Sequence, residues 1–287
     1  MTIGIIGRGF VGNAIEKFLI KTNISTISYD LKDNRDLNIA YEDIVVNSDT
    51  IYLCLPTPMN NDGSCCVDIV DNSLKVLDYY SEKNNVKPII LIKSTLVPES
   101  INNFQNKYQN ILLVHNPEFL TERTAEKDFE QSTNHLFGLS FLSNNETTIS
   151  KIKDLYYRLF INSNLIFVKS IESELIKYLT NSFFAVKVSF ANQIYELCNK
   201  LNINYMEFIK NAILADPRIG ELHWQVPGHD GKFGFGGSCF PKDLNGMINL
   251  FYSKSINPYI LKAAKDYNDI IRPDKDWENL KGRAVVE

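Results

Sequence analysis

The chain lacks the features that mark several large classes of protein. It contains no run of about 18 apolar residues, so no transmembrane helix is expected. Its 30 Lys and Arg residues against 34 Asp and Glu give a net charge of -4, without the basic excess typical of nucleic-acid binders. Internal repeats and low-complexity linkers are also missing. The 287 residues therefore predict a globular protein of one large or two medium domains, acting on neither membranes nor nucleic acids.

Cysteine is scarce, with five residues, which is an odd number. No pair of cysteines has a metal-ligand spacing with histidines nearby, so we expect no metal site. The chain begins with a strand-like segment rather than a signal peptide. Free thiols and a location in the reducing cytoplasm are the expected state.

Glycine is concentrated next to one of these cysteines, in the segment Gly234–Asp243, which reads GFGGSCFPKD. Pro241 suits the first turn of a helix that begins at about Ser238 or Cys239. A cysteine at a helix N-terminus is more easily ionised to the nucleophilic thiolate. Two interpretations of Cys239 follow: a small buried hydrophobic residue behind a glycine turn, or a reactive nucleophile.

A second signal lies at the other end of the chain, in GRGFVG at Gly7–Gly12. A strand-like run precedes it and a segment with helical spacing follows it, which is the context that a dinucleotide-binding fingerprint requires. Gly7 permits the tight turn, Gly9 lets a pyrophosphate approach, and Gly12 allows close packing of helix on strand. The expected cofactor contacts also include Phe10 and Val11.

The segment after this fingerprint predicts the identity of the cofactor. Ser25–Tyr29 has the pattern of a second strand and ends just before Asp30. An acid at this point binds the ribose hydroxyls and favours NAD over NADP. Lys32 lies close enough to Asp30 to leave that preference open.

Strand-like and helical segments alternate through the first half of the chain, which predicts a Rossmann-like, doubly wound parallel sheet of the α/β class. From Ser173 to Leu201 the spacing is that of one long helix, and further helices are expected after it. We expect an NAD-binding domain at residues 1–170, an all-helical central dimerisation domain carrying the cysteine at 171–271, and a tail at 272–287, docked or partly loose.

Together these motifs resemble the UDP-glucose/GDP-mannose dehydrogenase family. The resemblance extends over nearly the whole chain. In chain order it rests on Gly7–Gly12, Leu55–Pro58 (LPTP), Lys93–Pro98 (KSTLVP), Asn116–Glu122 (NPEFLTE), Lys177 with Asn181, Asp216–Gly220 (DPRIG) and Gly234–Asp243. It implies an NAD-dependent, four-electron oxidation of a nucleotide sugar at C6, with UDP-glucose as the expected substrate.

The resemblance assigns catalytic roles. Cys239 is the nucleophile that holds the sugar as a thiohemiacetal and then as a thioester. Lys177 and Asn181 stabilise negative charge on oxygen, and Asp243 activates or positions water. For Lys177, Asn181 and Asp243, the alternative is an ordinary charged or polar residue on a solvated helix face.

It also assigns binding roles. Glu118 takes part in acid–base chemistry or organises water; the alternative interpretation is that it caps a turn. Thr95 binds both the active-site water and the cofactor. Thr57 and Glu122 contact the cofactor. The remaining expected substrate contacts are Phe119, Leu120, Arg218 (reaching across a subunit interface), Phe233, Gly234 and Gly237.

The resemblance also has two departures. The chain stops soon after the helix that leads into the family's second Rossmann-like domain, so we expect it to lack most of the uridine-binding wall. The loop Gln225–Lys232 is unusual, with Asp230 near the position where some members carry a substrate-binding lysine; Lys232 could substitute.

Two other functions stay open. One is a two-electron 2-hydroxyacid-type dehydrogenase related to 6-phosphogluconate dehydrogenase, which shares the Rossmann domain and the Lys-x-x-x-Asn spacing but needs no cysteine segment. The other is a cofactor-binding partner of a full-length enzyme with little turnover of its own. The resemblance also implies a homodimer or larger homo-oligomer, because the family's central helices form the subunit interface and the long helix here has an apolar face that needs a covering partner.

Overall fold

The computed structural model describes residues 1–287. The chain forms two compact units, which are described separately. Unit 1 comprises Met1–Thr57 with Val67–Lys177, and unit 2 comprises Pro58–Cys66 with Tyr178–Glu287. The short loop Pro58–Cys66 therefore belongs with the C-terminal half of the chain, although the sequence places it inside the first half.

Unit 1 is built on a seven-stranded sheet of order β2-β1-β3-β4-β5-β6-β7. The strands are β1 (Thr2–Ile6), β2 (Ser25–Tyr29), β3 (Thr50–Leu53), β4 (Ile89–Ile92), β5 (Leu112–His115), β6 (Asn134–Leu139) and β7 (Asn164–Lys169). The predicted doubly wound α/β fold is confirmed, with one correction. β6 pairs antiparallel to β5, so β6 and β7 run against the other five strands.

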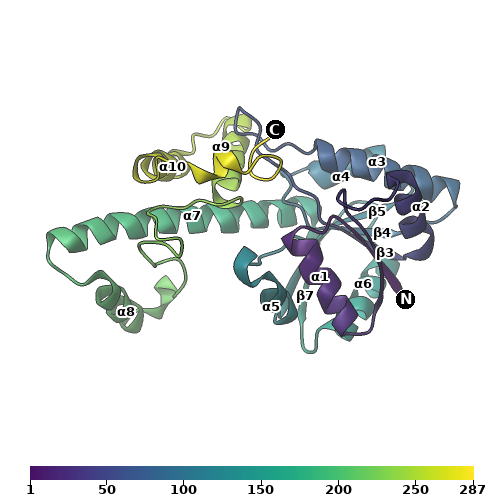
Figure 1. The fold of residues 1–287 in the computed structure, drawn as a ribbon, viewed down its shortest axis with the longest axis horizontal. Coiled ribbons are helices and arrows are strands. Elements are labelled where there is room, and N and C mark those ends of the chain that lie inside the picture. Colours follow the sequence, from purple (N-terminus) through teal and green to yellow (C-terminus); the bar gives the residue numbers. More distant parts are fainter. The chain divides into compact units, whose positions relative to one another are not determined.

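Helices cover both faces of this sheet (Figure 1). They are α1 (Phe10–Lys21), α2 (Leu37–Asn47), α3 (Asp68–Lys83), α4 (Ser100–Lys107), α5 (Ala125–Glu130) and α6 (Glu146–Leu159), with a 3-10 turn η1 (Glu122–Thr124) before α5. One buried cluster joins the sheet to α1, α5 and α6, and a second joins it to α2, α3 and α4. The strands are apolar on both faces because both faces are covered.

The strand order has a functional consequence. β1 lies between β2 and β3. After α1 the chain adds β2 along one edge of β1, and after α2 it adds β3 along the opposite edge. Such a switch point opens a crevice at the carboxyl ends of the strands, and ligands of doubly wound proteins bind there. Gly7 directly follows β1 and thus lies at this crevice.

Unit 2 is mainly helical. α7 (Ser170–Lys200) is one continuous helix of 31 residues, whose part from Tyr178 onward belongs to this unit. The other elements are α8 (Tyr205–Ala215), η2 (Pro217–Ile219), α9 (Phe240–Ser253), α10 (Tyr259–Ile271) and η3 (Asp276–Asn279). Two small apolar clusters hold them, one between α7 and α8 and one between α7, α9 and α10. None of the helices in the chain combines the length and apolar composition that a membrane span requires.

The C-terminal tail is packed onto unit 2. The Met59 N–H donates to the carbonyl of Ala284 at 2.8 Å, and the Val286 N–H donates to the carbonyl of Met59 at 2.9 Å. Trp277 and Ala284 are buried. The tail is therefore docked on the loop Pro58–Cys66, which settles the choice between a docked and a loose extension.

Candidate active site

The glycine turn after β1 has the shape of a dinucleotide cradle. Gly7 has a φ of 87°, in the left-handed region, and its N–H bonds to the carbonyl of Tyr29 at 2.9 Å. A Cβ on Gly12 would lie 1.9 Å from the carbonyl oxygen of Gly7, whereas a Cβ on Gly9 would meet no atom within 4 Å. Gly9 also caps α1. The space above the helix N-terminus thus stays open for an anionic group, as a bound dinucleotide needs.

Asp30 follows β2 and is already oriented by its backbone neighbours. Its carboxylate accepts hydrogen bonds from the N–H groups of Arg8 at 2.7 Å and Lys32 at 3.1 Å. Partial burial works to raise the pKa of Asp30, but these two bonds outweigh it and the pKa is lowered. The carboxylate has lone pairs left for ribose hydroxyls, so the residues present fit the adenosine half of NAD.

The other expected cofactor residues fall into two groups. Thr57 donates its hydroxyl to the carbonyl of Thr95 at 2.8 Å, and both threonines are buried in unit 1. Phe10 and Val11 pack partly against the core cluster beneath α1. The side chains of Lys32 and Glu122 are exposed, Glu122 within η1.

Lys177 and Glu118 come together inside unit 1. The Lys177 ammonium donates to the Glu118 carbonyl at 2.5 Å and lies 3.5 Å from the Glu118 carboxylate. It also lies 5.1 Å from the ring centroid of Phe119. Their side chains are only 5% and 9% exposed, so neither residue is an ordinary solvated surface charge. A buried ammonium held in one position can stabilise an oxyanion better than a mobile one.

Lys93 is a second buried lysine near Glu118, and its motif gave no indication of a role. The Lys93 ammonium donates to the side-chain oxygen of Asn116 at 3.0 Å, and the Tyr156 hydroxyl donates to the same oxygen at 2.8 Å. Burial lowers the pKa of Lys93 to about 8, against the opposing effects of Cys54 and Glu118. Lys93 and Glu118 line one small pocket of about 100 Å³. Glu118 therefore has two buried lysines in its surroundings, Lys93 and Lys177.

Asn181 and Asp243 come together inside unit 2. The amide of Asn181 donates to one carboxylate oxygen of Asp243 at 2.5 Å, and the Lys242 ammonium lies 2.5 Å from the other. Asp243 is 1% exposed, which excludes a surface helix charge. Its N–H bonds to the carbonyl of Cys239 at 2.9 Å in the first turn of α9.

Cys239 is the N-cap residue of α9, as the sequence predicts to within one residue. Ser238 lies beside it, with its hydroxyl 3.6 Å from the sulfur. Burial alone would lower the pKa of Lys242, but the charges of Asp243, Cys65 and Cys239 outweigh it and raise that pKa. A permanently charged ammonium near the sulfur and a helix N-terminus both favour the thiolate. The contribution of Lys242 was missed, since a lysine inside a motif carries no sign of its burial.

The remaining expected substrate residues have varied surroundings. Phe119 and Phe233 are 46% and 41% exposed, while Leu120 is partly buried against the unit 1 core. Gly234 and Gly237 have φ values of 70° and 71°, which only glycine adopts readily. The Arg218 side chain is 88% exposed and ion-paired with Asp216 at 2.5 Å. Its exposure leaves the guanidinium accessible to another molecule.

Comparisons with known proteins point in one direction. The UDP-glucose/GDP-mannose dehydrogenase family matches twice: its NAD binding domain over residues 32–160 and its central domain over residues 171–270. A UDP-glucose 6-dehydrogenase of Rickettsia felis is 32% identical over 228 residues, covering 78% of this chain and 48% of that protein. The chain spans about half the length of this and similar curated relatives. A UDP-glucose 6-dehydrogenase of Haloferax volcanii is 26% identical, and the match covers all of this chain and 74% of that protein.

Solved structures share the fold. A UDP-glucose dehydrogenase from Pyrobaculum islandicum superposes with a TM-score of 0.82 at 23% identity, over 94% of this chain and 68% of that one. A 3-hydroxyisobutyrate dehydrogenase from Mycobacterium tuberculosis superposes with a TM-score of 0.71 at 14% identity, over 96% of this chain and 94% of that one. At these identities the likeness concerns the fold alone.

Proposed function

The chain belongs to the UDP-glucose/GDP-mannose dehydrogenase family, with NAD as its cofactor, and on that premise we propose that it oxidises a nucleotide sugar, UDP-glucose first among candidates, to the uronic acid at C6. Oxidising a primary alcohol to a carboxylate removes four electrons. NAD, when bound, accepts a hydride, so two molecules of NAD are consumed for each sugar. The protein must hold the half-oxidised sugar while the cofactor is exchanged.

Cys239 holds that intermediate. Its thiolate adds to the carbonyl carbon of the aldehyde, a carbon–sulfur bond forms, and the carbonyl electron pair moves to oxygen. After the second hydride leaves the same carbon, the product is a thioester. Water then attacks the thioester and loses one proton to a base, and the carbon–sulfur bond breaks to release the thiolate and the carboxylic acid, which loses the second proton to solvent.

The buried polar residues fill the remaining roles. Lys177 stabilises the oxyanion that forms when the thiolate adds, and Glu118 beside it organises water or accepts a proton. Asn181 keeps Asp243 in one orientation, and Asp243 in turn positions the water that attacks the thioester. In the same way we assign substrate contacts to Phe119, Leu120, Phe233, Gly234 and Gly237.

One observation supports this proposal above the others. Asp243 and Asn181 are buried, and with Lys242, whose side chain is 11% exposed, they form a polar and charged cluster one helical turn from Cys239. Burying charges is costly unless they are paired, and such clusters gather at functional sites. A cysteine that served only as packing would not need them.

The experiment is a panel of nucleotide sugars, each supplied in limiting amount with excess NAD, scored by the NADH formed per sugar. We expect two NADH per molecule of UDP-glucose. One NADH per sugar would instead favour a two-electron dehydrogenase, the alternative whose fold the 3-hydroxyisobutyrate dehydrogenase shares. NAD binding without NADH from any sugar would favour a cofactor-binding partner of low turnover.

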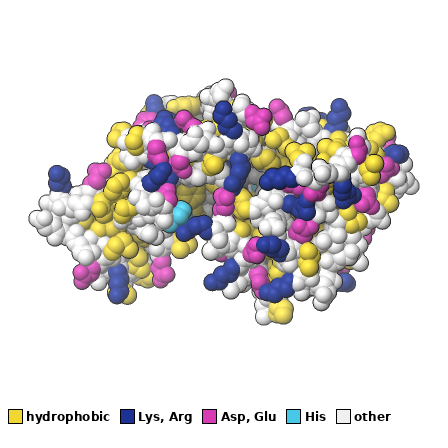
Figure 2. Space-filling model, viewed as in Figure 1, with side chains coloured by type: hydrophobic (Ala, Val, Ile, Leu, Met, Phe, Trp, Pro, Cys, Tyr) yellow, Lys and Arg dark blue, Asp and Glu magenta, His cyan; other side chains and the backbone are white.

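We further propose a homodimer or larger homo-oligomer. Figure 2 shows hydrophobic side chains gathered at its left, over α8 and the neighbouring part of α7. Large apolar side chains there are 40–73% exposed: Phe183, Phe190, Leu197, Leu201, Met206, Phe208 and Leu214. An exposed apolar surface of this kind is typical of an interface. Arg218 would reach the substrate of the second subunit.

A further inference from the structure

The C-terminal end of α10 forms hydrogen bonds with the glycine-rich segment that leads to Cys239. All of the residues involved lie in unit 2. Asn268 and Arg272 are four residues apart, so they project from the same face of the helix onto the same stretch of backbone, Phe233–Gly237. No feature of the sequence gave either residue a role.

Asn268 bonds to both backbone groups of one residue. Its side-chain oxygen accepts from the Phe235 N–H at 2.7 Å, and its amide donates to the Phe235 carbonyl at 3.0 Å. Asn268 is 2% exposed, and Phe235 is buried as well. Phe235 is four residues before Cys239, so this pair of bonds fixes the backbone shortly before the nucleophile.

Arg272 ties the same segment to the tail. Its guanidinium pairs with Asp230 at 2.5 Å and Asp276 at 2.7 Å, and donates to the Phe233 carbonyl at 3.3 Å. Asp276 also accepts from the Gly237 N–H at 3.2 Å. The Arg272 side chain is 3% exposed, so its guanidinium is almost completely buried, whereas its two carboxylate partners are each 31% exposed.

This contact requires glycine at two positions of the segment, and at the first of them, Gly234, the backbone angle requires it as well. A Cβ on Gly234 would lie 2.3 Å from the side-chain oxygen of Asn268. A Cβ on Gly236 would lie 2.5 Å from the guanidinium of Arg272 and 2.5 Å from the carboxylate of Asp276. The backbone therefore lies directly on these polar groups, with no room for a side chain.

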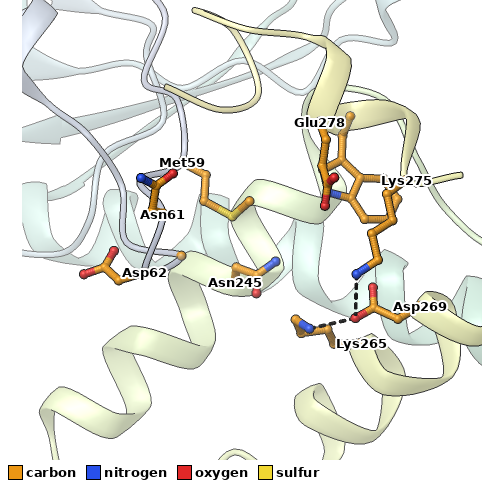
Figure 3. Close-up of a pocket in the computed structure, with 10 residues that line it drawn as sticks. Met59, Asn61, Asp62, Asn245, Lys265, Asp269, Lys275 and Glu278 are labelled. Carbon is orange, nitrogen blue, oxygen red and sulfur yellow. Dashed lines mark hydrogen bonds and ion pairs between the residues drawn. The ribbon is translucent and has the colours of Figure 1, made fainter. Parts of the chain in front are cut away.

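The tail residues that follow Arg272 are themselves attached to α10. Figure 3 shows Lys265 and Lys275 converging on Asp269. The two ammonium groups lie 2.9 and 3.5 Å from the Asp269 carboxylate, and all three residues line a pocket of about 300 Å³. Trp277 and Glu278 of η3 line the same pocket, together with Asn61 and Asp62 of the loop Pro58–Cys66. The residues after Arg272 thus have their own anchor on α10.

We propose that Asn268 and Arg272 are positioning residues for the nucleophile: they hold Phe233–Gly237 so that the Cys239 sulfur stays at the N-terminus of α9. This inference rests on the proposed function for its catalytic consequence. Its physical basis is that thiolate formation depends on the position of the sulfur relative to the helix end and Lys242. A displacement of about 1 Å can cost about 100-fold in rate.

The main test is Asn268→Ala, with Ser189→Ala as its matched control. Ser189 is also buried in unit 2 and donates one hydrogen bond to α10, to the Ala264 carbonyl at 3.2 Å, away from the glycine segment. We expect Asn268→Ala to lower kcat about 100-fold. The kcat of Ser189→Ala should stay within about threefold of the wild-type kcat. Loss of a buried hydrogen bond that does not involve the glycine segment lowers stability but leaves the position of the sulfur unchanged. Equal kcat losses in the two variants would overturn the proposal.

A second readout needs no sugar and separates this proposal from the proposed function. Iodoacetamide labelling of the full chain at neutral pH, followed by peptide mass mapping, gives the alkylation rate of each cysteine. We expect Asn268→Ala to slow alkylation of Cys239 about tenfold, since less of the thiol would be ionised. Cys198, which is 3% exposed, reports general loosening and should not change. Unchanged Cys239 labelling, or parallel increases at both cysteines, would contradict positioning.

If Asn268→Ala does not fold, Gly236→Ala tests the contact of the glycine segment with Arg272 and Asp276 instead. The φ angle of Gly236 lies outside the left-handed region, so an alanine is opposed there by Arg272 and Asp276 rather than by its own backbone. We expect slower Cys239 labelling in Gly236→Ala and partial recovery when Arg272→Ala is added, because the guanidinium no longer occupies the space. Equal labelling in the single and double variants would count against the role of Arg272.

Discussion

The amide of Asn181 donates a hydrogen bond of 2.5 Å to the carboxylate of Asp243, and both side chains are almost completely buried. The second oxygen of that carboxylate lies 2.5 Å from the ammonium of Lys242. Asp243 is thus a charged group with a partner on each oxygen, and it does not move freely. A carboxylate fixed in this way is suited to orienting a water molecule.

Asp243→Asn should damage both stability and turnover. It leaves the Lys242 ammonium buried without its partner, which costs about 3–5 kcal/mol. Chemical denaturation measures this loss. Asp269→Asn is the control, because the partly exposed ion pairs of Asp269 with Lys265 and Lys275 should each contribute less than about 1 kcal/mol. A loss no larger in Asp243→Asn than in Asp269→Asn would contradict the account of the buried cluster.

Lys177→Met should lower kcat about 100- to 1,000-fold, the usual loss when one group that stabilises an oxyanion is removed. NAD affinity should change little, since the glycine turn and Asp30 are untouched. Steady-state kinetics and a fluorescence titration with NAD measure the two effects. Lys200→Met, at the exposed end of the same helix, is the control and should keep wild-type kcat. A fall in NAD affinity that accounts for the whole effect would remove Lys177 from the chemistry.

Gly9→Ala and Gly12→Ala should fail for different reasons. An alanine at Gly9 meets no atom within 4 Å, so stability should stay within about 0.5 kcal/mol of the wild type. NAD binding should nevertheless weaken at least tenfold, because the methyl group occupies the approach of the pyrophosphate. Gly12→Ala should destabilise the fold itself, since its Cβ would lie 1.9 Å from the Gly7 carbonyl oxygen. Calorimetric titration and thermal unfolding separate the two; unimpaired NAD binding by a stable Gly9→Ala would refute the assigned cradle.

His115 should make the protein sensitive to acid. It is completely buried at the end of β5, between the Ser173 hydroxyl at 2.8 Å and the Ser94 carbonyl at 3.2 Å. Burial, assisted by Lys93 and Lys177, lowers the pKa of His115 to about 3 against the opposing bond to Ser94. The unfolded chain therefore binds a proton on this histidine between about pH 6.5 and pH 3 that the folded chain does not, and stability falls as the pH falls through that range.

The sign can be checked with His115→Asn, which keeps one hydrogen-bonding group but does not titrate. Between pH 6.5 and pH 4, the free energy of unfolding of the variant should fall by roughly 3 kcal/mol less than that of the wild type. His229→Asn replaces an exposed histidine and should keep the wild-type slope. Identical slopes in all three proteins would exclude His115 as the acid-sensitive group.

Much of the fold could be predicted from the sequence. The strand Ser25–Tyr29 was predicted to the residue, and the long helix predicted at Ser173–Leu201 is observed at Ser170–Lys200, because the apolar spacing of both segments is regular. α2 and α6 were missed, although Asp36 and Asn145 cap them with side-chain hydrogen bonds. The antiparallel β5–β6 pairing was also missed, since strand direction depends on the connection and not on the strand's own residues.

The candidate site was predictable only where residues form a motif. Cys239, Asp243, Lys177 and Glu118 could be proposed as site residues because they stand in motifs that resemble those of the family. The roles of Asn268 and Arg272 were not, because a hydrogen bond from one helix to a distant backbone leaves no local pattern. The burial of Lys93 and Lys242 was hidden for the same reason: lysine is almost always exposed, and only three-dimensional packing reveals the exceptions.

The central claim is that Cys239 carries the sugar between two oxidations. The most direct measurement is the NADH yield of Cys239→Ser with limiting UDP-glucose and excess NAD, beside the wild type. A serine hydroxyl is a much weaker nucleophile at neutral pH, so the variant should stop after partial oxidation, with fewer than two NADH per sugar, or accumulate a covalent adduct at residue 239. The wild type should give two. Two NADH per sugar from Cys239→Ser at the wild-type rate would contradict the account.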